Sequence, residues 1–175
     1  MEWTIGDIIA IVAVVLSVTG GVFAFLKWRK QTQARYSEVL RDIIYNIRVD
    51  EENRDIFYQL EYGKFKYTPD FHSSELEKKT DKLLTQYNYF CYLRSKKVIG
   101  KDEFAIVKYH IHRAISNIHI QNYLFNIYHF AKKVQNGADN DFSFAYLIKY
   151  GVGAGIIKEN FYEKDNKDYI HVLNF

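Results

Sequence analysis

The stretch that decides the fold lies near the N-terminus, where residues 8–26 read IIAIVAVVLSVTGGVFAFL. These nineteen residues include no charged side chain. At 1.5 Å per residue, a helix of this length extends about 28 Å, close to the hydrocarbon thickness of a bilayer. A buried core helix is rarely so long and apolar on every face. The run therefore predicts a single-pass transmembrane anchor over residues 1–30.

The charges that flank the run predict its orientation. Basic residues follow it at Lys27, Arg29 and Lys30, whereas the charged residues before it are Glu2 and Asp7. Because Lys and Arg concentrate on the cytoplasmic side, we expect the N-terminus outside and residues 31–175 in the cytoplasm. The alternative is a cleaved signal peptide, since Val22-Phe23-Ala24 resembles a cleavage site. A signal peptide would carry Lys or Arg ahead of the apolar run, and this sequence does not.

Small side chains recur in the anchor at alternating steps of three and four residues. They are Gly6, Ala10, Ala13, Ser17, Gly20 or Gly21, and Ala24. This spacing aligns them along one helix face, where small residues let helix backbones approach closely in lipid. We therefore expect the anchor to self-associate, although glycine and alanine are also simply common in membrane helices. If the anchors enclose a pore, the candidate mouth residues are Thr4 and Asp7 outside and Lys27, Arg29 and Lys30 inside.

The chain after the anchor continues with helical spacing, and no Gly or Pro interrupts it between Lys27 and Arg48. Apolar side chains recur at Tyr36, Val39, Leu40, Ile43, Ile44 and Ile47. This periodicity predicts that the anchor helix leaves the membrane unbroken. A second helix is expected from about Asp50, with Glu51 and Glu52 in its first turn, to Gly63.

The rest of the chain predicts an all-α cytoplasmic domain over residues 31–175. Ser74 and Glu77 form a capping-box pattern ahead of a helix whose apolar face carries Leu76, Leu83, Leu84, Tyr87, Phe90 and Cys91. Two further helices are expected around residues 106–118 and 123–131, the second stopped by Gly137. The stretch KFKYTPDF at 64–71 is expected to be a loop or a short strand. The tail YIHVLNF at 169–175 alternates like a strand.

Composition excludes several protein classes. The chain of 175 residues is 48% hydrophobic and 26% charged, with one proline, which excludes a disordered tail or a Pro-rich linker. One cysteine, Cys91, excludes an intrachain disulfide framework and a Cys-rich zinc module. It lies on an apolar face, which predicts a buried structural thiol rather than a nucleophile. The net charge of +3 is too small to predict nucleic-acid binding by itself.

Neither the histidines nor the glycines form a convincing cofactor motif. On one helix His110 and His112 point about 200° apart, and no nearby carboxylate or cysteine completes a ligand set with His119. The segment GVGAG at 151–155 is not followed by Gly-Lys-Ser/Thr, so a turn or helix stop is expected instead of a phosphate loop. We therefore predict no metal and no cofactor.

One constellation points to catalysis. The segment HRAISNIH places Arg113 six residues before His119, which resembles the signature of HEPN ribonucleases. In that family the histidine moves a proton at the ribose hydroxyl and the arginine stabilises charge on the phosphate without a metal. Ala114 stands where a polar residue usually follows the arginine, so the motif is degenerate. The alternatives are a solvated arginine with a packing histidine, a subunit contact, or RNA binding.

Taken together, the anchor, the basic KWRK segment at 27–30, the small helical domain and the HRAISNIH motif resemble one known family. It is the small membrane accessory protein found beside the RNA-guided RNA-cutting effector of subtype VI-B CRISPR systems. The resemblance implies a ring-shaped homo-oligomer, an octamer, that forms a pore in the bacterial inner membrane. It also implies that the pore strengthens antiphage defence by depolarising the membrane when the effector detects phage RNA.

Three functions therefore remain open from the sequence. The first is a membrane pore that acts in antiviral defence. The second is a membrane-anchored metal-independent ribonuclease that uses Arg113 and His119. The third is a membrane-tethered interaction module with no activity of its own.

Overall fold

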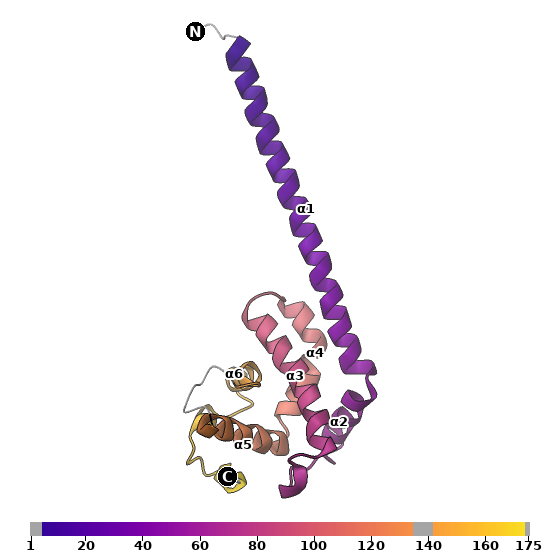
Figure 1. The fold of residues 1–175 in the computed structure, drawn as a ribbon, viewed down its shortest axis with the longest axis vertical. Helices are drawn as coiled ribbons and strands as arrows, with labels where there is room; N and C mark the ends of the chain where they lie inside the picture. Colours follow the sequence, from indigo (N-terminus) through magenta and orange to yellow (C-terminus); the bar gives the residue numbers. More distant parts are fainter. Residues whose placement is uncertain (1–4, 135–141, 174–175) are drawn as a thin grey trace. The chain divides into compact units, whose positions relative to one another are not determined.

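The computed structural model describes residues 5–134 and 142–173, and in these residues all regular structure is helical. One long N-terminal helix is followed by a helical bundle (Figure 1), which confirms the predicted all-α class. Two compact structural units divide between Ile43 and Ile44, inside the long helix. Continuous helical periodicity, with no Gly or Pro after Gly21 in this segment, explains why that helix runs through the division.

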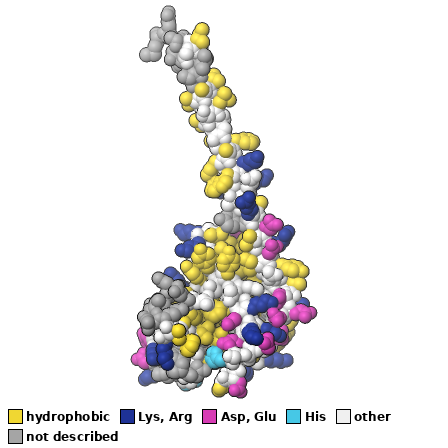
Figure 2. Space-filling view, in the orientation of Figure 1, with side chains coloured by type: hydrophobic (Ala, Val, Ile, Leu, Met, Phe, Trp, Pro, Cys, Tyr) yellow, Lys and Arg dark blue, Asp and Glu magenta, His cyan; other side chains and the backbone are white. Residues whose placement is uncertain are grey.

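The first helix, α1 (Ile5–Val49), is 45 residues long. Within the described part of the chain, it is the one helix long and apolar enough to cross a membrane. Its large apolar side chains, such as Val14, Leu16 and Phe23, are more than half exposed. Figure 2 shows hydrophobic side chains along the helix and Lys and Arg side chains further along it. A soluble helix would bury such a surface, whereas lipid can cover it.

The bundle contains α2 (Glu51–Glu61), α3 (Glu75–Ser95), α4 (Lys101–Ile115), α5 (Ile118–Val134) and α6 (Ala145–Gly153). In residues 5–134 and 142–173 the structure also has three short 3₁₀ turns: η1 (Pro69–Phe71), η2 (Glu159–Tyr162) and η3 (Ile170–Val172). Helix α3 is central, because it packs against α2, α4 and α6. In Figure 1, α3 and α4 lie side by side and are joined by a short loop.

Local capping explains where two of these helices begin. Asp50 caps α2, because its carboxylate accepts a hydrogen bond from the backbone N–H of Asn53 at 3.0 Å. Ser74 caps α3 in the same way, with its hydroxyl accepting from the N–H of Glu77 at 3.1 Å. The reciprocal contact differs from the standard capping box, because the Glu77 carboxylate accepts from the N–H of Ser73 at 2.5 Å. Both helix starts confirm the sequence prediction.

The core of the bundle is formed by apolar faces of several helices. Its fully buried side chains include Leu83, Leu84, Tyr87 and Phe90 on α3, Ile111 and Ile115 on α4, Leu124 and Phe125 on α5, and Leu147 and Ile148 on α6. Cys91 is also buried, and burial raises the pKa of its thiol to about 12. The thiol therefore stays protonated at neutral pH, which confirms the prediction of a structural cysteine.

The C-terminal segment corrects one expectation. The alternating tail was expected to be strand-like, but within the described residues it forms the 3₁₀ turn η3. Side chains hold it against α5: the Tyr169 ring stacks on Phe125 with centroids 5.1 Å apart, and the Asn126 amide donates to the Val172 carbonyl. The described chain offers no strand with which this tail could pair, so the alternation of apolar and polar residues alone does not produce a strand here.

The glycine-rich segment ends α6. Helix α6 runs through Gly153, and Gly155 adopts the left-handed region with φ +68°. The N–H groups of Ile156 and Ile157 both donate to the Gly151 carbonyl, at 2.9 and 3.1 Å. These bonds satisfy an orphan carbonyl at the helix end, so the predicted helix stop is confirmed. Gly137, the expected stop of α5, lies outside the described residues.

Candidate functional site

The residues of the HEPN-like motif lie on two different helices. Arg113 belongs to the last turn of α4, which ends at Ile115, and His119 is the second residue of α5. The turn at Ser116 and Asn117 separates them, and the Asn117 side chain accepts from the backbone N–H of His119 at 2.9 Å. Because the helix breaks between them, the relative orientation of the Arg113 and His119 side chains differs from the one that a six-residue spacing gives on one continuous helix.

Arg113 is engaged by the C-terminal end of α2. Its Nε donates to Oε2 of Glu61 at 3.1 Å, and its Nη2 donates to the Glu61 backbone carbonyl at 2.6 Å. The other oxygen of that carboxylate accepts from the Tyr109 hydroxyl at 2.7 Å. A guanidinium placed here satisfies the terminal carbonyl of α2 and complements the negative end of its helix dipole. Arg113 therefore joins α4 to α2.

His119 has a different environment from Arg113. Partial burial lowers the pKa of its imidazole, and the charge of Lys66 lowers it further. The ring is therefore neutral at pH 7. In the described residues no hydrogen bond or ion pair joins His119 to Arg113. Within a single chain, the two side chains therefore do not form a shared site through direct contact.

The two histidines of α4, His110 and His112, have local contacts. The His112 ring shares a hydrogen bond of 2.7 Å with the Tyr150 hydroxyl, and the His110 ring lies against Phe57 with centroids 4.3 Å apart. Burial lowers the pKa of both imidazoles. Among the residues that the structure describes, no group of three His, Cys, Asp or Glu side chains could hold a metal ion.

The small residues of the predicted anchor are accessible along α1. The exposed ones are Gly6, Ala13, Ser17, Gly20, Gly21 and Ala24, and the basic side chains Lys27, Arg29 and Lys30 are exposed too. A Cβ added at Gly20 or Gly21 would meet no atom within 4 Å. Within the described part of one chain no neighbouring side chain packs against these glycines, so a second helix could approach α1 there. Thr4 and the side chains of Asp7 and Ala10 lie outside the described residues.

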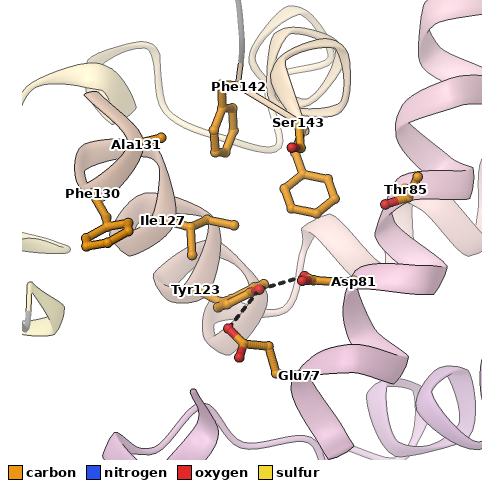
Figure 3. Close-up of a pocket in the computed structure, with 10 residues that line it drawn as sticks. Glu77, Asp81, Thr85, Tyr123, Ile127, Phe130, Ala131, Phe142 and Ser143 are labelled. Carbon is orange, nitrogen blue, oxygen red and sulfur yellow. Dashed lines mark hydrogen bonds between the residues drawn. The ribbon is translucent and has the colours of Figure 1, made fainter. Parts of the chain in front are cut away.

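A pocket that the sequence did not predict opens between α3 and α5 (Figure 3). It has a volume of about 360 Å³. One side is polar, with Glu77, Asp81 and Thr85 one helical turn apart along α3. The rest is mainly apolar: Tyr123, Ile127, Phe130 and Ala131 come from α5, and Phe142, Ser143 and Phe144 come from the segment that leads into α6.

The polar side of the pocket contains a series of close polar contacts. The Tyr123 hydroxyl lies 2.6 Å from Oδ1 of Asp81 and 3.2 Å from Oε1 of Glu77 (Figure 3). The same Glu77 oxygen lies 2.9 Å from Nδ1 of His72, whose Nε2 is 2.8 Å from the Tyr67 hydroxyl. Because a phenol has one proton, Tyr123 donates to one carboxylate at a time. The shorter distance favours Asp81 as the acceptor.

Burial is the main cause of the pKa shifts on the polar side of the pocket. Desolvation raises the pKa of the Asp81 carboxyl, against a smaller lowering by its bond to Tyr123. Desolvation also raises the pKa of the Tyr67 phenol to about 12, and burial together with the Asp81 bond raises that of Tyr123. Both phenols therefore keep their protons at neutral pH. A partly buried carboxylate with a raised pKa, in a concave site, is a frequent mark of a functional position.

The sequence contained only a weak signal for this pocket. Glu77 was recognised through the capping box, and Asp81 follows it at the i,i+4 spacing that places both carboxylates on one face of α3. Tyr123 was assigned to an apolar helix face, which hides the role of its hydroxyl. Contact between α3 and α5 depends on tertiary packing across 42 positions of sequence, and local periodicity contains no such information.

Comparison with models of protein families, with curated proteins and with solved structures gives no significant match for this chain.

Proposed function

We propose that this chain is a single-pass protein of the bacterial inner membrane that assembles through α1 into a homo-oligomeric ring enclosing a pore. The observation that carries the proposal is α1 itself, which is long and apolar enough to cross a membrane and leaves its small residues exposed. Lipid provides no hydrophobic drive between helices, so close backbone approach along a small-residue face is the available means of association.

The orientation follows from the charges beside the apolar run. Lys27, Arg29 and Lys30 lie at one end of it, so the bundle is proposed to be cytoplasmic and the N-terminus periplasmic. The resemblance to the accessory protein of subtype VI-B CRISPR systems supports a role in antiphage defence through membrane depolarisation. In that role the partner is the RNA-guided RNA-targeting effector, and eight copies form the ring.

Ribonuclease activity receives less support. Arg113 is engaged with the carboxylate and the backbone carbonyl of Glu61, and His119 lies on the next helix. An arginine that stabilises a phosphate must offer its N–H groups to that phosphate. Such activity would therefore need Arg113 to leave Glu61, or a second copy of the chain to complete the site.

The test is the native mass of the full-length protein in detergent, with imaging of its particles and ion flux after reconstitution into liposomes. We expect a closed ring and a flux that collapses a potassium gradient. The variant Ser17→Leu adds bulk to the small-residue face and should reduce both the mass and the flux. Val15→Leu also introduces a leucine, with a smaller gain in bulk, about 160° away on the helix and serves as the control.

A monomeric protein without flux would contradict the proposal and would favour a membrane-tethered interaction module. A ring that forms without ion flux would retain self-association but exclude the pore. Equal behaviour of Ser17→Leu and Val15→Leu would show that the small-residue face does not mediate assembly.

A further inference from the structure

The pocket between α3 and α5 has the dimensions of a small-molecule site. Its volume of about 360 Å³ lies at the lower end of the range of ligand pockets, which is roughly 300–1,000 Å³. In Figure 3, Ile127 and Phe142 project into the space that the carboxylates of α3 face. An acidic side and an apolar side thus share one concave surface.

In the described structure, no Lys or Arg side chain pairs with the carboxylates of the acidic side. Among the described residues that line the pocket there is no Lys or Arg. The nearest lysines on α3 have other partners, since Lys78 pairs with Glu75 and Lys82 pairs with Asp50 and Glu52. His72 contacts Glu77, but in the described residues the only hydrogen bond to the Asp81 carboxylate is that of Tyr123 to Oδ1. Oδ2 of Asp81 therefore has an open acceptor position.

The acidic side of the pocket suits a cation, and the apolar side indicates which class of cation fits. Ca²⁺ and Mg²⁺ take about six or more oxygen ligands, and the described residues form no group that could hold a metal. The faces of aromatic rings attract cations and also pack against hydrocarbon. Phe130, Phe142 and Phe144 line the same pocket as the carboxylates. A cation with an apolar body matches both sides of the pocket.

We propose that this pocket binds an organic ammonium ion, with Oδ2 of Asp81 accepting a hydrogen bond from the charged nitrogen and the aromatic wall covering the apolar body. Glu77 adds negative charge one turn away, while its oxygens stay engaged by the Ser73 N–H and the His72 ring. This site lies entirely within the bundle, so the proposal does not rest on a pore or on self-association.

The test uses the full-length protein in lipid nanodiscs and phenethylammonium as the probe, with calorimetry as the readout. We expect saturable binding with a dissociation constant below about 1 mM. The nearly isosteric neutral alcohol 2-phenylethanol should bind at least about tenfold more weakly, because it cannot form the charge-assisted bond. Empty nanodiscs give the correction for partition into lipid.

Three variants locate the site. Asp81→Asn removes the charge and keeps the shape and the acceptor for Tyr123, and it should weaken binding at least about tenfold. Ala131→Phe leaves every charge in place but fills the pocket, and it should also weaken binding. Glu51→Gln removes an exposed carboxylate on α2 and should bind like the unchanged protein, which controls for net charge.

Several results would overturn the proposal. These are absence of binding by the unchanged protein, equal binding of the alcohol, or unchanged affinity in Asp81→Asn or Ala131→Phe. Thermal melts of each variant show whether the bundle is folded. Failure of the pore test, with amine binding intact, would leave this site unaffected.

Discussion

Gly151 and Gly153 show how one glycine-rich motif contains residues with different tasks. A Cβ at Gly151 would lie 2.6 Å from Cδ1 of Ile157 and 3.3 Å from Cδ1 of Ile115, both of which are buried. A Cβ at Gly153 would meet nothing within 4 Å. Gly151 therefore permits close packing of α6, whereas Gly153 has no such role.

We expect Gly151→Ala to lower the free energy of unfolding by about 1–3 kcal/mol, because the added methyl overpacks the core. Gly153→Ala is the matched control and should raise it by up to about 1 kcal/mol, since alanine costs less backbone entropy in a helix. Urea denaturation of both variants measures the difference. Equal effects would contradict the assignment of close packing to Gly151.

Tyr87 presents a buried polar atom without a partner. Its ring is fully buried on α3, and its hydroxyl has no hydrogen-bond partner among the residues that the structure describes. Leaving such a group unsatisfied costs about 1–3 kcal/mol. We therefore expect Tyr87→Phe to be neutral or stabilising in urea denaturation, whereas Tyr123→Phe, which removes a bond to Asp81, should destabilise. Loss of stability in Tyr87→Phe would imply a partner for the hydroxyl.

Asp81 and Asp50 should influence stability with opposite dependence on pH. The folded-state pKa of Asp81 is raised, so its ionisation costs stability above that pKa, and the cost disappears as the pH falls through it. The folded-state pKa of Asp50 is lowered, chiefly by the hydrogen bond from Lys82. Its stabilisation is complete above the unfolded pKa and is lost as the pH falls through the folded one.

Thermal melts of Asp81→Asn and Asp50→Asn between pH 3 and pH 7 test this contrast. Near pH 7 we expect Asp81→Asn to raise Tm by about 2 °C and Asp50→Asn to lower it by a similar amount. Both differences should shrink in acid. Asparagine retains the helix-capping ability of Asp50, so its effect reports the lost ion pairs with Lys82. The same sign for both variants would contradict the assignment.

At the scale of elements, the contact between Arg113 and Glu61 links α4 to the end of α2. Its two hydrogen bonds and the adjacent Tyr109 bond form one partly exposed network. The contact gives Arg113 a structural role that does not require RNA. Helix α2 has 11 residues and is too short to be stable alone, so the packing of its buried Ile56 and Leu60 holds it in the bundle and this link adds to that packing.

A double-mutant cycle with Arg113→Ala and Glu61→Ala should give a coupling energy of about 0.5–1 kcal/mol, typical of a partly exposed pair. His119→Ala paired with Arg113→Ala should give no coupling, because no contact joins those residues in one chain. Denaturation of the single and double variants measures both cycles. Strong coupling of Arg113 to His119 would support the ribonuclease interpretation instead.

Local sequence patterns predicted several elements well. The uninterrupted helix after Lys27, the caps at Asp50 and Ser74 and the buried face of α3 depend on residues at most a few positions apart. The tail at 169–173 was predicted wrongly because its conformation depends on Phe125 and Asn126, more than forty positions away. The Arg113–Glu61 contact has a similar separation of 52 positions and was not predicted.

At the scale of the whole molecule, the proposed assembly depends on the identity of the anchor. Replacing residues 1–26 with a single-pass helix that is monomeric in lipid should leave the bundle folded but abolish the ring and the ion flux. Native mass and flux in liposomes measure this outcome, and the thermal melt of the bundle is the control. A chimaera that still conducts ions would contradict a pore built from α1.

The sequence by itself determined the membrane-compatible helix and the all-α class, because hydropathy and helical periodicity act between residues close in the chain. Tertiary structure decided which polar groups meet: Arg113 with Glu61 rather than His119, and Asp81 with Tyr123 in a pocket between α3 and α5. The physical reason is the separation in sequence of the residues that interact. Helices form from contacts three or four residues apart, whereas sites form where faces of distant helices pack, and many packings satisfy the same amphipathic pattern.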